Sequence, residues 1–168
     1  MKFLLNPTAE VAARARPPVR VFLAFSMLLV IGLAAQRAAS GGFSPAGVRD
    51  AYAGEAASAV ALWEEVHQLA FLYGFLTLAI GSLLVVSPLP ARARSVLIGA
   101  MAAATLADLF APFAILALRG GGVLRLVTGV ACPAALLAAA GAAFATFASP
   151  QGPGPSKPAP GGNGHVHD

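Results

Sequence analysis

The chain has 168 residues, of which 58% are hydrophobic and only 11% carry a charge, and its mean hydropathy is +0.76. About a quarter of the residues in a soluble domain are charged, so this chain has too little polar surface to fold in water and is expected to be solvated by a lipid bilayer. Its net charge of +4 and its pI near 10.0 would suit a nucleic-acid-binding protein. The arginines, however, lie beside apolar segments and form no stripe on a soluble face, which excludes nucleic acid as a partner.

The N-terminal region precedes the first apolar run. Residues 1–20 hold no sustained apolar stretch and are predicted to be a cytoplasmic segment, in which Pro17 and Pro18 stop any helix that begins earlier. Residues 21–36 are apolar and flanked by arginines that can snorkel, so they are predicted to span the bilayer. A cleaved signal peptide is the competing interpretation, because the apolar core is short and residues 38–40 (AAS) resemble a cleavage site.

The loop after this first span carries a helix-start signal. Ser44 can cap a helix whose first residue is Pro45. Apolar residues then recur at spacings of four and seven, which predicts an amphipathic helix at about 45–60, kinked at a glycine and lying on the membrane surface. Tyr52 and Trp63 are the expected interface anchors, with Trp63 in the aromatic belt where the chain enters the bilayer.

Three further apolar runs are predicted to span the membrane, at about 66–86, 96–118 and 126–148. Residues 149–168 are rich in Gly and Pro, and they are predicted to form a disordered cytoplasmic tail. The fold class expected from these elements is an all-α membrane protein, with four transmembrane helices in an up-down bundle and a short periplasmic surface helix. Small residues at fourfold spacing in the later spans favour close helix packing.

The distribution of basic residues predicts the orientation. If both termini are cytoplasmic, the two densest arginine clusters, at 14–20 and 92–94, lie inside. The bias toward Ala, Gly and Arg suggests a bacterial genome rich in GC, so the expected location is the bacterial inner membrane. In this orientation the acidic residues between the spans all face the periplasm: Asp50, Glu55, Glu64 and Glu65.

Asp108 is the most unusual residue, because a carboxylate at the centre of a span costs about 2.5–3.5 kcal/mol on insertion scales. An apolar setting favours its neutral form. As a functional residue it would be the proton or cation site of a small transporter or ion-translocating subunit, with Glu64 and His67 at the entrance. The structural alternative is a protonated carboxyl that is hydrogen-bonded to a neighbouring helix, for example to Thr77. The sequence shows no second charge deep in the membrane.

Glu64 and His67 share a helical face at the mouth of the second span, beside Glu65. Carboxylate-bridged metal sites in helix bundles use the spacing Glu-x-x-His. Here it occurs once, so a haem- or metal-binding redox subunit would need a second copy of the chain to supply further ligands. The alternatives are a simple interfacial ion pair between Glu64 and His67, and a pH-sensitive polar cluster. His165 and His167 in the tail are taken as incidental, and no cofactor or metal is expected.

Motifs of enzymes are absent from the sequence. It has no glycine-rich phosphate loop, no zinc-binding pair on a helix and no nucleophile elbow. Cys132, the only cysteine, lies in an apolar run and is interpreted as a buried apolar residue. We therefore expect a non-enzymatic membrane component or accessory subunit, with a membrane-protein partner or a homo-oligomer. The surface helix and the acidic mouth would be the interaction site.

Three short motifs resemble a pattern of uncharacterised small four-helix bacterial inner-membrane proteins. They are GFSPAGV at 42–48, AYAG at 51–54 and EEVH at 64–67, which correspond to a Ser/Thr-Pro-x-Gly-Val periplasmic loop, a Tyr-x-Gly step and a helix that opens with Glu and His. The resemblance extends from Gly42 to the fourth span and implies the topology without an activity. The pattern has a second histidine two positions after the first, where this chain has Leu69, and this departure weighs against an inherited metal or haem site.

Overall fold

The computed structural model describes residues 9–41, 44–53, 59–118 and 120–148, which form helices and turns with no β-strand among them. The helices are α2 (Ala9–Gly41), α3 (Pro45–Ala53), α4 (Ala59–Val86), α5 (Ala91–Ala117) and α6 (Gly121–Ala148). Of these, α2, α4, α5 and α6 are long and apolar enough to cross a membrane. The prediction of an all-α membrane protein with four transmembrane helices is therefore confirmed.

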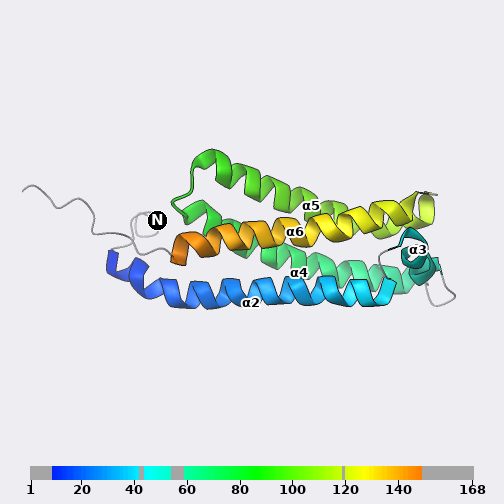
Figure 1. Cartoon of the computed structure of the whole chain (residues 1–168), viewed down its shortest axis with the longest axis horizontal. Coiled ribbons are helices and arrows are strands. Elements are labelled where there is room, and N and C mark those ends of the chain that lie inside the picture. Colours follow the sequence, from blue (N-terminus) through cyan, green and yellow to red (C-terminus); the bar gives the residue numbers. More distant parts are fainter. Residues whose placement is uncertain (1–8, 42–43, 54–58, 119, 149–168) are drawn as a thin grey trace, which may run out of the picture.

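The four long helices lie side by side along the long axis of the molecule, and α3 lies across one end (Figure 1). The start of α2 and the end of α6 lie together at the opposite end. Arg20 of α2 links the two helices there, because its guanidinium donates hydrogen bonds to the carbonyl oxygens of Phe147 and Ala148 at 2.8 and 2.9 Å. These carbonyls belong to the last turn of α6 and have no partner within the helix.

The helices are longer than their apolar runs. The prediction that Pro17 and Pro18 stop an earlier helix is wrong, because α2 runs through both prolines. Proline leaves the carbonyl four residues earlier without its helical hydrogen bond. Both prolines are exposed near the end of the bundle, where water or headgroups can bond these carbonyls. The membrane-crossing part of α2 extends over Ala15–Ala39 and exceeds the predicted 21–36. Residues 1–8 and the predicted tail at 149–168 lie outside the described residues.

The capping motif at the start of α3 folds as predicted. The backbone N–H of Gly47 donates to Ser44 Oγ, and that of Val48 donates to the Ser44 carbonyl, both at 3.0 Å. Val48, on the inner side of α3, is buried. The helix packs on α6, α2 and α5. The structure gives α3 as far as Ala53. Residues 54–58, where the sequence predicts a kink and a continuation toward residue 60, lie outside the described part.

Two glycines let α6 begin in close contact with its neighbours. A Cβ on Gly121 would collide with the carbonyl oxygen of Ala114 and the Cα of Ile115 in the last turns of α5. A Cβ on Gly122 would lie 2.6 Å from the carbonyl oxygen of Pro45 in α3. The first turn of α6 is thus wedged between α5 and α3, and this placement brings the following residues of α6 into the bundle.

The core contains side chains from all four long helices, and it includes Leu23, Leu76, Leu84, Met101 and Leu136. Three small residues of α6, Ala139, Ala140 and Ala143, are also buried, as expected for a close helix contact in lipid. Many large apolar side chains instead cover the outside of the bundle, for example Phe25, Phe71 and Leu78. An apolar exterior of this kind suits contact with lipid chains.

Candidate functional site: a buried charge cluster

The carboxylate of Asp108 is the meeting point of the four long helices. Asp108 lies on α5 and is 0% exposed. Arg37 of α2 donates to its Oδ2 at 2.7 Å, and Tyr73 of α4 donates to the same oxygen at 2.6 Å. Arg125 of α6 donates to Oδ1 at 2.5 Å. One side chain from each transmembrane helix therefore takes part in a single set of hydrogen bonds.

Arg125 also bonds the backbone of α5. Its Nη1 donates to the carbonyl oxygen of Asp108 at 3.0 Å. In a regular helix that carbonyl would accept from the N–H of residue 112, but residue 112 is proline and has no N–H. Pro112 thus frees a carbonyl inside the bundle, and Arg125 supplies the missing donor. The same guanidinium binds both the side chain and the main chain of Asp108.

Two further contacts extend the network. Arg125 Nη2 bonds Glu65 Oε1 at 3.2 Å, and Arg37 lies 5.8 Å from the ring centroid of Tyr73, within the range of a cation–π contact. We call Arg37, Glu65, Tyr73, Asp108 and Arg125 the charge cluster. It holds two carboxylates and two guanidinium groups, so its formal charges balance. Paired charges of this kind are the form in which ionised groups can be buried.

These contacts correct the predicted surroundings of Asp108. The sequence shows no second deep charge, and its structural alternative for Asp108 is a protonated acid that is hydrogen-bonded to a residue such as Thr77. Instead, two arginines reach the carboxylate, and two ion pairs favour its ionised form. The hydroxyl of Thr77 is buried and has no hydrogen-bond partner among the described residues.

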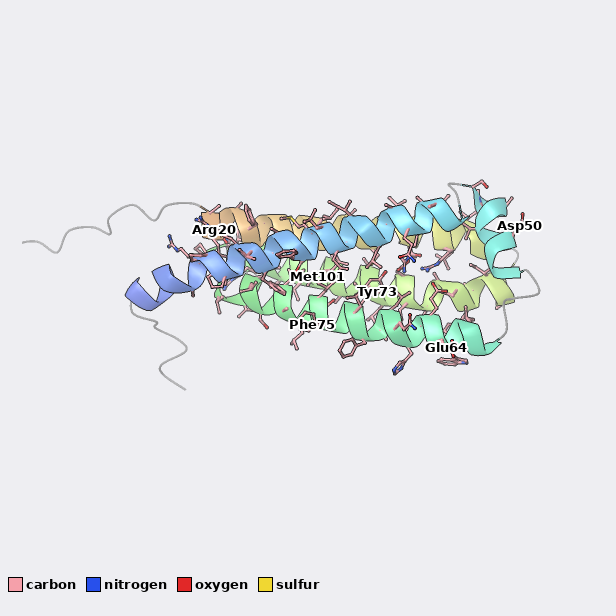
Figure 2. The ribbon with its side chains drawn as sticks, turned by 90° about the horizontal axis from the view of Figure 1, so that it is seen from below. Arg20, Asp50, Glu64, Tyr73, Phe75 and Met101 are labelled. Carbon is pink, nitrogen blue, oxygen red and sulfur yellow. The ribbon has the colours of Figure 1, made fainter. Side chains whose placement is uncertain are left out.

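The charge cluster lies toward the α3 end of the bundle. At 1.5 Å of rise per residue, about 13 Å of helix separate Asp108 from the end of α5 at Ala117. In Figure 2 the labelled residues follow one another along the long axis from Arg20, through Met101, Tyr73 and Glu64, to Asp50 on α3. Glu65, which belongs to the predicted mouth, is 37% exposed and joins the cluster through Arg125. Asp108 and the mouth of the second span are therefore connected through Arg125.

The other residues of the predicted mouth face outward from α4. Glu64 and His67 are both exposed, and no hydrogen bond or ion pair joins them to each other or to another described residue. The expected Glu64–His67 pair is thus not formed. Trp63 is exposed and packs on Phe113 of α5, with 5.0 Å between ring centroids. The side chain of Tyr52 lies outside the described part of the structure, so its role as an anchor stays a prediction.

Metal ligands do not gather in the part of the chain that the structure describes. No group of three His, Cys, Asp or Glu side chains in it is placed to hold a metal ion. Among the described residues that line the surface around His67, Glu64 is the one further carboxylate, histidine or cysteine. Cys132 is fully buried, as predicted, within the core cluster. The arrangement of charges can therefore hold helices together, whereas metal coordination would need ligands from elsewhere.

Comparison with known proteins places the chain in a family. Residues 42–150 match the family model Aq_1264_TM, described as a transmembrane helical domain. The chain belongs to this family. The matched residues coincide with the stretch over which the sequence resembles small four-helix membrane proteins, although the match leaves the Ser-Pro-x-Gly-Val loop motif itself untested. The Aq_1264_TM region contains every member of the charge cluster except Arg37, which lies on α2. Searches of curated proteins and of solved structures each found no match.

Arg37 and Arg125 belong to the site, although neither was predicted from the sequence. Both flank apolar runs, and the positive-inside rule treats such residues as loop charges. Two features of the sequence could have indicated that an arginine reaches Asp108. Pro112 frees the carbonyl of Asp108 and so predicts that a donor lies nearby. In addition, α5 and α6 form a hairpin, so residues on either side of its turn lie at similar depths, and the long side chain of Arg125 covers the remaining difference from Asp108.

Proposed function

We propose that this protein is a non-enzymatic accessory component of the bacterial inner membrane, in which Asp108 is a structural junction. The observation that carries the proposal is the bonding of one buried carboxylate by Arg37, Tyr73 and Arg125, each from a different transmembrane helix. An acid with three donors has a structural reason to lie inside a membrane protein, so it need not be explained by ion transport.

A transport role for Asp108 is the competing proposal, and the geometry disfavours it. A translocated cation would have to replace two guanidinium groups that already neutralise the carboxylate. Removing one partner from a buried ion pair typically costs about 3–5 kcal/mol, so repeated release of Asp108 during transport would meet a large barrier. Glu65 pairs with Arg125, so the two carboxylates of the charge cluster are matched by its two guanidinium groups. The described residues of the cluster therefore carry no excess negative charge that would attract a cation.

Three hydroxyl groups inside the predicted spans are held by their own helices and are not arranged as nucleophiles. The hydroxyls of Ser26, Ser82 and Thr105 each donate to a backbone carbonyl one turn earlier in their own helix. Hydroxyls bonded in this way serve the helix, and no general base orients them for attack. These contacts support an accessory role over a catalytic one.

Flux measurements in proteoliposomes separate the accessory role from transport. Purified parent protein and Asp108→Asn are reconstituted into vesicles loaded with a pH-sensitive dye, and proton and monovalent-cation fluxes are recorded. We expect the parent to match empty vesicles. A proton or cation flux of the parent above that of empty vesicles would contradict the proposal. Transport through Asp108 would be established if Asp108→Asn protein with native helix content loses this flux while Ser82→Ala keeps it.

We further propose that α3 is the contact surface for a membrane-protein partner. This helix lies at the end of the bundle and packs on it through the buried side chain of Val48. Its exposed residues include Pro45, Ala46 and Asp50. A photoreactive amino acid placed at Asp50 should crosslink to one specific membrane protein in native membranes. The same label at Leu78, exposed on the apolar side of α4, is the control. Equal crosslinking from both positions would contradict the proposed surface.

The proposed orientation places both termini in the cytoplasm and α3 in the periplasm. Its support is the excess of arginine at the end that holds Arg20, Arg92 and Arg94. A reporter that is active only in the periplasm should work when fused after Ala56 and stay silent when fused after Arg94. Activity only after Arg94 would reverse the orientation.

A further inference from the structure

A hollow on the outer surface of α4 has no role in the charge cluster. It is shallow and wide open to the outside, with a volume of about 390 Å³, and it is lined mostly by carbon atoms of Trp63, Glu64, His67 and Gln68. All four side chains are exposed, with Trp63 at 62%. We call it the α4 hollow. Polar side chains that face outward from a transmembrane helix are uncommon, because such residues normally face the bundle interior or water, so the α4 hollow needs an explanation.

The position of the hollow indicates what surrounds it. The opposite face of α4 is buried through Leu62, Val66 and Tyr73, so the hollow faces away from the bundle. It lies in the first turns of the membrane-crossing segment Leu62–Val86, and Figure 2 shows Glu64 close to the α3 end. Tryptophan at the end of a span typically lies at the depth of lipid headgroups. The α4 hollow is therefore expected to meet headgroups laterally, within the bilayer.

The polar ends of these exposed side chains, together with the apolar wall beside them, suit a zwitterionic headgroup that carries acyl chains. The carboxylate of Glu64 and the face of the Trp63 indole both attract an ammonium group. The imidazole of His67 and the amide of Gln68 can both donate to phosphate oxygens. Side chains three or four residues apart share a helix face, so the cation-binding and phosphate-binding groups lie side by side. An anionic headgroup without an amine would leave Glu64 without a partner and next to a negative charge.

We propose that the α4 hollow binds the headgroup of a phosphoethanolamine lipid, with the ammonium at Glu64 and Trp63 and the phosphate at His67 and Gln68. Farther along the same outward side of α4, Phe71 and Phe75 are 79% and 53% exposed. They give the acyl chains of the bound lipid an apolar surface that continues from the hollow. Binding of this kind requires only that the chain crosses a bilayer, and it does not depend on the accessory role proposed above.

The single tryptophan of the chain provides the measurement, because Trp63 itself lines the hollow. The full-length protein is reconstituted into mixed vesicles of phosphatidylethanolamine and phosphatidylglycerol, in which one lipid or the other carries bromine on the acyl carbons nearest its headgroup, at the depth expected for Trp63. Bromine quenches indole fluorescence only at short range, so the two series report which lipid occupies the site. Two weak contacts at an exposed site predict about a fivefold preference for phosphatidylethanolamine.

Matched variants separate the site from the general environment of Trp63. Glu64→Gln should reduce the preference to about twofold or less, and the double variant Glu64→Gln/His67→Ala should abolish it. Ser82→Ala, also exposed on α4 but far from the hollow, should keep the parent preference. All of these side chains are on the surface, so folding is expected to be preserved.

Two results would overturn the proposal. Equal quenching of the parent by both brominated lipids means that the hollow does not select a headgroup. Weak quenching by both lipids means that protein covers Trp63, and crosslinking would then show whether a second copy of this chain is the occupant.

Discussion

Replacement of Asp108 by asparagine tests the charge cluster with a minimal change of shape. Asparagine keeps one oxygen acceptor and nearly the same volume, but it removes the negative charge. Arg125, which is 5% exposed, and Arg37, which is 23% exposed, would then face each other across a neutral amide. Of the carboxylates in the cluster, only Glu65 would remain.

The expected loss of stability follows from the contacts. Asp108 accepts three charge-assisted hydrogen bonds, from Arg37, Tyr73 and Arg125. Bonds to a charged group contribute about 1.5–3 kcal/mol each, but asparagine retains a neutral acceptor and the arginines regain some solvation. Loss of one partner from a buried ion pair costs about 3–5 kcal/mol. We therefore expect Asp108→Asn to lower the free energy of unfolding by about 3–5 kcal/mol.

Reversible unfolding in mixed micelles measures this loss, with helix content followed by circular dichroism as a denaturing detergent is added. Glu64→Gln is the matched control, because Glu64 is exposed on α4 and has no ion pair among the described residues, and it should change the free energy by less than about 0.5 kcal/mol. Combining Asp108→Asn with Arg125→Gln should reveal a coupling of about 2 kcal/mol. An Asp108→Asn variant as stable as the control would refute the structural role of the cluster.

Two further substitutions test how the ends of the bundle are held. Gly122→Ala should lower the free energy of unfolding by about 1–3 kcal/mol, because the new methyl group would lie 2.6 Å from the Pro45 carbonyl oxygen and displace α3; Gly74→Ala, where nothing lies within 4 Å of the new methyl group, should not destabilise the protein. Arg20→Gln should cost about 1 kcal/mol through its lost bonds to the end of α6, whereas Arg92→Gln, at an exposed position, should have little effect. Both pairs are measured by the same unfolding titration, and equal losses within a pair would contradict the assigned contact.

The sequence was sufficient to predict the four transmembrane helices, because the bilayer sets both the length and the hydrophobicity of a span. The cap of α3 was also predictable, since Ser44 followed by Pro45 is a local signal that acts within one turn. The helix ends were predicted less well. Hydropathy marks where lipid contact ends, whereas α2 and α4 continue beyond that point.

The partners of Asp108 could not be predicted from hydropathy. Arg37 and Arg125 have the same local sequence context as loop arginines, and only the packing of α2 and α6 brings both guanidinium groups to one carboxylate. Glu64 and Glu65 show the same limit. They are adjacent in sequence, yet Glu65 bonds Arg125 while Glu64 faces outward, because successive residues on a helix point about 100° apart.

The protonation state of Asp108 tests the central claim most directly. Infrared difference spectra between the parent and Asp108→Asn, recorded with the protein in lipid at neutral pH, isolate the signal of this one side chain. An ionised junction held by Arg37 and Arg125 predicts that the substitution removes a carboxylate band and no band of a protonated acid. If the substitution instead removes the band of a protonated acid, Asp108 is not an ionised junction, and it becomes a candidate proton site.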